Sequence, residues 1–128
     1  MFDRIETLQM ARALTGHAVQ RQKLIAQNVA NADTPDFKSR DLSGFAETYR
    51  SHVSAEMRAT RQGHLTGLSW GGAQRVKDAG GEPAPNGNTV SIEDEMIRIA
   101  SARREFELSL AVTRSAMSLI RTSIGRRS

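Results

Sequence analysis

One pentapeptide of the chain has the residue types of a hydrolase nucleophile. Gly67-Leu68-Ser69-Trp70-Gly71 fits G-x-S-x-G, the turn that exposes a catalytic serine between a buried strand and a helix. The flanking segments are polar, and that fold needs a histidine after the serine, whereas the last histidine here is His64. We therefore expect a chance match and no catalytic site at Ser69.

The other residues that could do chemistry are also poorly placed for it. Glu105 and Glu107 would lie on different faces of a helix and could not share a proton, and the two Gly-Gly pairs lack the lysine and helix of a phosphate-binding loop. Cysteine is absent. The histidines lack the spacing of metal ligands; they are His17, His52 and His64. The sequence therefore predicts no enzyme, no metal site and no cofactor.

The composition favours helices over a thick globular core. The chain has 128 residues, enough for one domain, and only 38% of them are apolar and 5% aromatic. The formal net charge of +4 is dispersed and forms no basic stripe, which argues against nucleic-acid binding. The N-terminus lacks the pattern of a cleaved signal peptide, and no run approaches the ~18 apolar residues of a membrane span.

Helical periodicity predicts an amphipathic helix over residues 3–32. Its apolar positions fall on one face, which Arg21 and Asn28 interrupt. Pro35 disfavours a helical conformation at the residue before it and so ends the helix. Those apolar positions, of which we assign Leu14, Ala18 and Ile25 to helix packing, are Met10, Ala11, Leu14, Ala18, Ile25, Val29 and Ala32.

A second, longer helix is predicted at the C-terminal end. Apolar residues recur there in alternating steps of four and three, which is the spacing of a coiled coil. Ser91 and Asp94 form a weak capping box at its start. The row contains Ile92, Met96, Ile99, Arg103, Phe106, Leu110, Thr113, Met117, Ile120 and Ile124, and we assign its eight apolar members to helix packing.

The middle of the chain shows no sustained period. It contains most of the ten glycines and two of the three prolines, and only residues 42–57 have the spacing of a short helix. We expect a mainly α fold in three segments: 1–35, the irregular segment 36–90, and 91–128. The two terminal helices would pair as an antiparallel coiled-coil-like hairpin.

The end of the first helix resembles a family signature. The chain reads N-V-A-N-A-D-T-P-D-F-K from Asn28 to Lys38, similar to N-(I/V)-A-N-x-x-T-P-G-(Y/F)-K of flagellar rod and hook proteins. Residues 39–42 and 87–96 resemble the most membrane-proximal rod subunit. The signature matches at Asn28, Val29, Ala30, Asn31, Thr34, Pro35, Phe37 and Lys38.

Asp36 departs from this signature, because the family usually has glycine there. Pro35 presets position i+1 of a turn, and Asp36 at i+2 suits a type I turn. Asn28 and Asn31 lie on one side of the helix near its end. There they could bond carbonyls of the last turn or a neighbouring subunit.

The resemblance implies a structural role in the flagellar basal-body rod. It implies polymerisation into a helical tube in the periplasm, termini that fold on assembly, and export by the flagellar type III apparatus without a cleaved signal peptide. The implied partners are copies of the chain, other rod subunits, the ring-to-rod junction protein and the membrane-supramembrane ring protein. It implies no nucleic acid and no small-molecule substrate.

A different class of protein is compatible with the same helices. A small helical adaptor, or a nucleic-acid-binding module, could use the C-terminal heptads to dimerise. Such a protein would form a folded, discrete oligomer, and the nucleic-acid binder would have a salt-sensitive affinity for its ligand.

Overall fold

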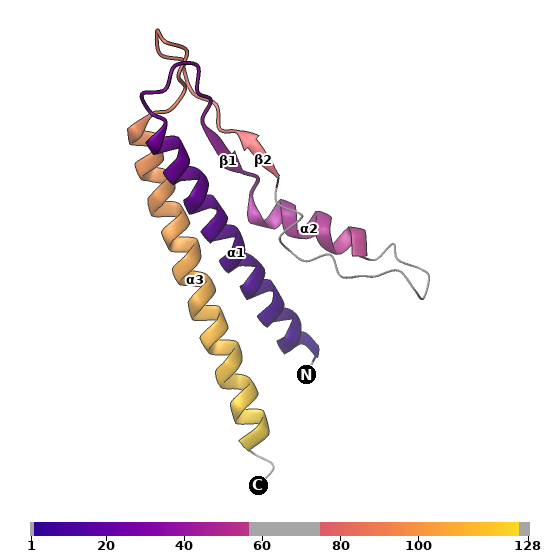
Figure 1. Cartoon of the computed structure of the whole chain (residues 1–128). Helices are drawn as coiled ribbons and strands as arrows, with labels where there is room; N and C mark the ends of the chain where they lie inside the picture. Colours follow the sequence, from indigo (N-terminus) through magenta and orange to yellow (C-terminus); the bar gives the residue numbers. More distant parts are fainter. Residues whose placement is uncertain (1, 57–74, 126–128) are drawn as a thin grey trace.

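Two long helices side by side dominate the fold (Figure 1). A computed structural model describes residues 2–56 and 75–125, in which α1 (Phe2–Ala30) and α3 (Ile92–Gly125) run antiparallel. The predicted mainly α fold with paired terminal helices is thus confirmed. The G-x-S-x-G segment at residues 67–71 and the histidine at position 64 lie outside the described residues.

The ends of both helices follow from local chemistry. α1 stops at Ala30, five residues before Pro35, and a series of turns follows. Before α3, the hydroxyl of Ser91 accepts a hydrogen bond from the backbone N–H of Asp94 at 3.4 Å. This N-cap satisfies one of the free donors of the first turn. With 34 residues, α3 is about 50 Å long.

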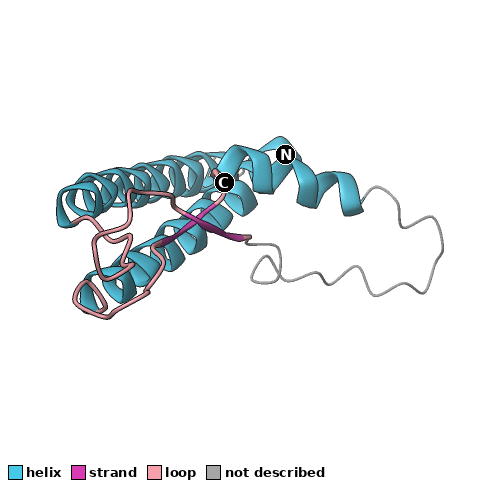
Figure 2. Cartoon of the chain, turned by 90° about the horizontal axis from the view of Figure 1, so that it is seen from above, coloured by secondary structure: helices cyan, strands magenta, loops and turns pink. Residues whose placement is uncertain are grey.

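The middle segment contains a short antiparallel ribbon and a short helix. β1 (Arg40–Leu42) pairs with β2 (Val76–Asp78), and α2 (Phe45–Glu56) agrees with the predicted short helix. Seen from above, the two strands cross beside the helix pair (Figure 2). The sequence did not indicate the strands, because three residues are too few to show a period.

The two long helices meet along rows of mostly small residues. One row of buried residues recurs every seven positions over part of each helix, which is the period of a coiled-coil seam. Small side chains at these positions let the two backbones approach closely. The row of α1 consists of Ala11, Ala18 and Ile25, and that of α3 of Glu95, Ala102, Ser109 and Ala116.

Within the described parts of the chain, no helix combines the length and apolar character that a membrane crossing requires.

Candidate assembly interface and a buried polar ladder

The signature residue Asn28 joins three elements. Its side chain is 1% exposed, accepts a hydrogen bond from the backbone N–H of Arg40 at 3.1 Å, and donates one to the Arg40 carbonyl at 2.8 Å. The amide thus pairs with β1 as a neighbouring strand would. Its second N–H donates to Glu95 Oε1 of α3 at 3.1 Å. Both N–H groups and the oxygen of the Asn28 amide therefore have a partner.

Glu95 is a fully buried carboxylate at the centre of these contacts. The residue is 0% exposed, and Oε1 accepts hydrogen bonds from Asn28, from the Ser39 hydroxyl at 2.9 Å and from the Arg98 guanidinium. A buried carboxylate is tolerated only when such donors replace its water. In the sequence, Glu95 is one of three consecutive acidic residues in the first turn of α3, and nothing in that pattern indicates its burial.

From Glu95, side chains of alternating charge continue along the interface between α1, β1 and α3. Arg98 Nε lies 4.0 Å from Asp41 Oδ2, and Arg21 contacts Asp41 at 3.0 Å and Glu105 at 2.9 Å. These groups are largely covered, so water screens them less than surface pairs. We call this set the polar ladder; its members are Glu95, Arg98, Asp41, Arg21, Glu105 and His17.

The polar ladder specifies how the elements fit together. Arg21 comes from α1, Asp41 from β1, and Glu105 from α3. Burial disfavours the charge of Arg21, but Asp41 and Glu105 outweigh that effect and raise the pKa of the guanidinium. Buried ion pairs add little net stability compared with apolar residues, but an incorrect register leaves charges unpaired. We therefore expect the ladder to favour this register of the hairpin over others.

Asn88 caps the C-terminal end of α1 from across the chain. Its amide nitrogen donates to the carbonyls of Asn31, Ala32 and Thr34 at 2.8–2.9 Å. As predicted, an asparagine of the signature also bonds the last turn, since Asn31 donates to the Gln27 carbonyl at 2.8 Å. Asn88 thus binds the carbonyls of the turns that follow α1, whereas the backbone N–H groups of Asn31 and Ala32 bind carbonyls of its last turn.

The predicted type I turn at Asp36 is wrong. Asp36 has a φ of 59°, in the left-handed region that position i+2 of a type II turn requires. Its backbone N–H donates to the Asn86 carbonyl at 3.0 Å, and nearby Lys38 donates to the carbonyl of Gly87 at 3.1 Å. These contacts with the 86–87 turn fix the conformation that the family's glycine would adopt freely.

We expect Asp36→Gly to stabilise the chain by about 0.5–1 kcal/mol. A left-handed aspartate is strained, and glycine removes that strain at the cost of a more flexible unfolded chain. Urea unfolding followed by circular dichroism would measure the difference. An unchanged or lower unfolding midpoint would show that Asp36 is not strained.

Gly87→Ala provides the matched test in the opposing turn. Gly87 has a φ of 83°, and a Cβ there would overlap Asp36 Oδ1. We expect a loss of about 1–2 kcal/mol, because the left-handed conformation is strained for alanine. In the Asp36→Gly background the loss should be smaller, because the overlapping carboxylate is gone. Equal losses in both backgrounds would contradict this contact.

The remaining signature residues lie around this turn and contribute less buried surface. Val29 is 41% exposed, Ala30, Thr34, Pro35 and Lys38 are exposed, and Phe37 is half-buried. The Thr34 hydroxyl donates to Asn31 Oδ1 at 3.2 Å. The signature therefore has a buried member, Asn28, and an exposed surface around the tip of the hairpin.

Of the predicted packing residues, those of α1 are buried or half-buried, whereas most of those of α3 are exposed. In α1, Ala18 and Ile25 are buried and Leu14 is half-buried. In α3, the buried row lies one position earlier than the predicted row, about 100° around the helix. Five apolar members of the predicted row are exposed and three are half-buried: Ile92, Met96, Ile99, Met117 and Ile124 are exposed, and Phe106, Leu110 and Ile120 are half-buried.

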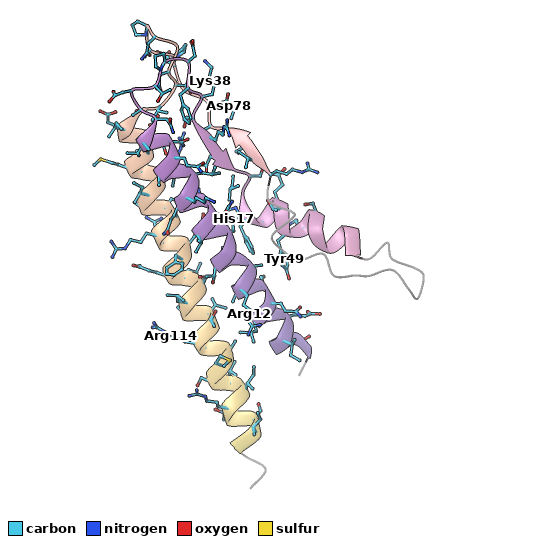
Figure 3. The ribbon with its side chains drawn as sticks, in the orientation of Figure 1. Arg12, His17, Lys38, Tyr49, Asp78 and Arg114 are labelled. Carbon is cyan, nitrogen blue, oxygen red and sulfur yellow. The ribbon has the colours of Figure 1, made fainter. Side chains whose placement is uncertain are left out.

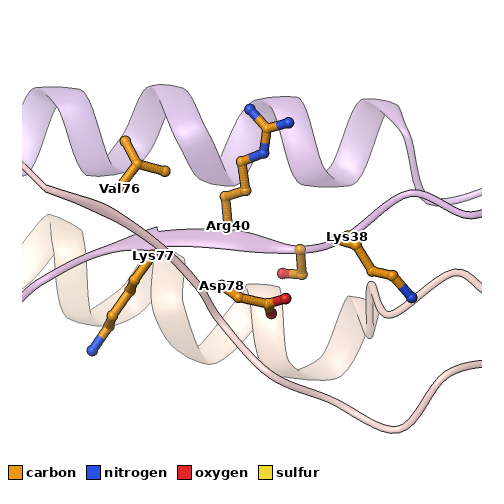
Figure 4. A pocket seen from close by; sticks show the side chains of 6 residues that line it. Lys38, Arg40, Val76, Lys77 and Asp78 are labelled. Carbon is orange, nitrogen blue, oxygen red and sulfur yellow. The ribbon is translucent and has the colours of Figure 1, made fainter.

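An open hollow of about 240 Å³ lies over the β1–β2 ribbon (Figure 4). Its lining includes three cations, Lys38, Arg40 and Lys77, and one carboxylate, Asp78. Such a surface attracts anionic groups rather than supplying a reactive group. Among the described residues, no three histidine or carboxylate side chains are grouped so that they could hold a metal ion.

Comparisons with known proteins agree with the signature, although no family model matches the chain. The chain is 31% identical to the flagellar basal body rod protein FlgB of Cereibacter sphaeroides over 106 residues, which cover 81% of this chain and 82% of the relative. FlgB of Agrobacterium fabrum is 31% identical over 74% of this chain and 75% of its own length. FlgB of Escherichia coli is 26% identical over 87% and 88%. The identity and coverage show that the chain belongs to the FlgB family of flagellar basal body rod proteins.

Proposed function

We propose that the chain is a structural subunit of the proximal flagellar rod, without enzymatic activity. It would polymerise into a helical tube that joins the membrane ring to the more distal rod and transmits torque. Family membership supports the location in the basal body. The apolar row of α3, of whose eight members five are exposed in the described chain, supports polymerisation.

The exposed members of the row carry this proposal because they recur from the first turn of α3 to its last. Met96 is 66% exposed and Ile124 is 68% exposed, and the row between them spans most of α3. Large apolar side chains that are exposed repeatedly along one helix support an interaction surface there. A row that packs on a different surface of the next copy makes a heterologous contact, and repeated heterologous contacts produce an open filament.

We further propose how the segments and partners are arranged. Segments 1–35 and 91–128 would form the core of the tube, and 36–90 would lie outside it. The neighbours would be copies of the chain, other rod subunits, the ring-to-rod junction protein and the membrane-supramembrane ring protein. The flagellar type III apparatus would deliver the chain to the periplasm without a cleaved signal peptide.

Ile99→Lys should abolish rod formation without unfolding the hairpin. Ile99 is 46% exposed, so a lysine stays in water in the free chain but would bury an unpaired charge in a subunit contact. The measurement is motility and rod formation in a strain that lacks its own copy of the subunit. Circular dichroism of the purified variant checks that its helix content is unchanged.

Ala100→Lys is the matched control, because Ala100 is exposed on the neighbouring face of the same helix turn. We expect it to support rods and motility. Normal motility with Ile99→Lys would contradict the proposed contact. A discrete closed dimer of the wild-type chain, with no rod defect in a deletion strain, would instead favour the adaptor alternative.

A further inference from the structure

His17 is buried between acceptors from two different parts of the chain (Figure 3). It is 2% exposed. Its Nε2 lies 2.8 Å from the carbonyl oxygen of Ser43, in the bend that leads into α2. Its Nδ1 lies 3.4 Å from Glu105 Oε2 of α3. The ring also contacts the edge of Phe45, with 5.7 Å between the centroids.

This geometry suits a doubly protonated ring. A carbonyl oxygen can only accept, so Nε2 must carry a proton, and a neutral imidazole has no second proton. In a neutral ring, the lone pair of Nδ1 would therefore face the Glu105 carboxylate. Within the described structure, Nδ1 and Glu105 Oε2 have no hydrogen-bond partner that meets the usual geometry. A proton placed between these two atoms would satisfy both.

We propose that His17 is a proton-operated latch. When its imidazole is charged, it holds α1 against α3 through Glu105 and against the bend before α2 through Ser43. When the ring is neutral, one of these two contacts becomes repulsive and the attachment weakens. The inference concerns the pairing of α1 and α3 within a single chain, and it differs from the expectation, implied by the family resemblance, that the termini fold only on assembly.

The charges around His17 favour the charged ring. α3 contributes Glu105, α1 contributes Arg21 one turn further on, and β1 contributes Asp41 through its contact with Arg21. On the α2 side the ring meets Phe45, on which Tyr49 stacks at 5.5 Å. With His17 charged, two cations face two carboxylates, whereas a neutral His17 leaves an excess of one negative charge.

The expected titration follows from these neighbours. Burial alone would lower the pKa of His17, but Glu105 and the Ser43 carbonyl outweigh it and raise the pKa above 6.5. His17 also lowers the pKa of Glu105 below 4.5. The histidine contribution is fully present below pH 6.5 and is lost as the pH rises through the raised pKa. The Glu105 contribution is lost as the pH falls below 4.5, so the latch is strongest between these values.

Proton NMR of the full chain tests the protonation directly. The His17 ring signal, assigned by its absence from His17→Gln, should titrate with a pKa above 6.5. In Glu105→Gln this pKa should fall relative to the wild type, because the anionic partner is gone. A wild-type pKa at or below 6.5, or no change in Glu105→Gln, would overturn the proposal.

The helix content of the full chain tests the latch. We expect more helix by circular dichroism, and a higher urea midpoint, at pH 5.5 than at pH 8.0. His17→Gln should remove this difference, whereas His64→Gln, which deletes another histidine, should retain it. Equal helix content at both pH values in the wild type, or the same pH difference in His17→Gln, would refute the latch.

Discussion

Asn28→Asp should unfold the hairpin of the free chain or leave it barely stable. The introduced carboxylate would lie about 3 Å from Glu95 Oε1, where Asn28 now donates, and it could no longer donate to the Arg40 carbonyl. An unpaired buried charge together with an unsatisfied carbonyl costs about 3–5 kcal/mol. That is a large part of the 5–15 kcal/mol by which a typical domain is stable.

Urea unfolding at neutral pH would measure this loss of stability. The same measurement at lower pH provides a second test. Two carboxyl groups so close can share a proton, so the deficit of the variant relative to the wild type should shrink as the pH falls toward 4. A simple packing defect would not respond to pH in this way. A loss below about 1 kcal/mol would contradict the role of Asn28 as a bridge between α1, β1 and α3.

Asn31→Asp is the matched control for this chemistry. Asn31 belongs to the same signature but lies directly after α1 and is only half-buried, and its amide donates only to the Gln27 carbonyl. A negative charge at a helix C-terminus costs about 0.3–1 kcal/mol, to which the loss of one exposed hydrogen bond adds little. The two variants thus separate the buried asparagine from the one at the surface.

The helical architecture could be predicted from sequence because its signals are long and local. The 4-3 spacing of α3 persists over more than four heptads, and Ser91 and Pro35 mark the chain near the ends of the helices. The observed bounds of α1 and α3 accordingly lie within two or three residues of the predicted ones. β1 and β2 were missed because their pairing depends on contacts between distant segments.

The inner face of α3 was harder to predict. The larger and more apolar residues, such as Met96, dominate any reading by hydrophobicity, whereas the buried row has alanine, serine and a glutamate. Hydrophobicity alone cannot tell whether an apolar row faces the partner helix or a neighbouring molecule. The seven-residue repeat of small residues in both helices was the signal that could have identified the seam.

The sequence gives only indirect evidence of the polar ladder. Arg21 and Asn28 interrupt the apolar face of α1, and both prove to be buried or half-buried at that interface. Polar residues at core positions imply buried partners. Their partners, Asp41, Glu95 and Glu105, come from segments far along the chain. No local pattern could have identified them.

Ala102→Leu should force the two helices apart. Asn28 contacts Glu95 and Thr15 contacts Ser109, so Ala102, midway between Glu95 and Ser109, lies opposite the part of α1 around Arg21, which binds the neighbouring Ser101. Ala102 is 0% exposed. Three extra carbon atoms in a closely packed seam cost about 1–3 kcal/mol. Separation of the helices would also lengthen the contacts of Arg21 with α3, which raises the expected loss to the upper end of that range.

Ala100→Leu isolates the packing effect, because leucine and alanine are both strong helix formers. Ala100 is exposed two residues away, so its replacement should change stability by no more than about 0.5 kcal/mol. Urea unfolding of the two variants gives the comparison. If Ala102→Leu lost no more stability than Ala100→Leu, the seam would have room for a large side chain. The helices would then not be held together by the fit of their small residues, and the large apolar row of α3 would be the more probable inner face.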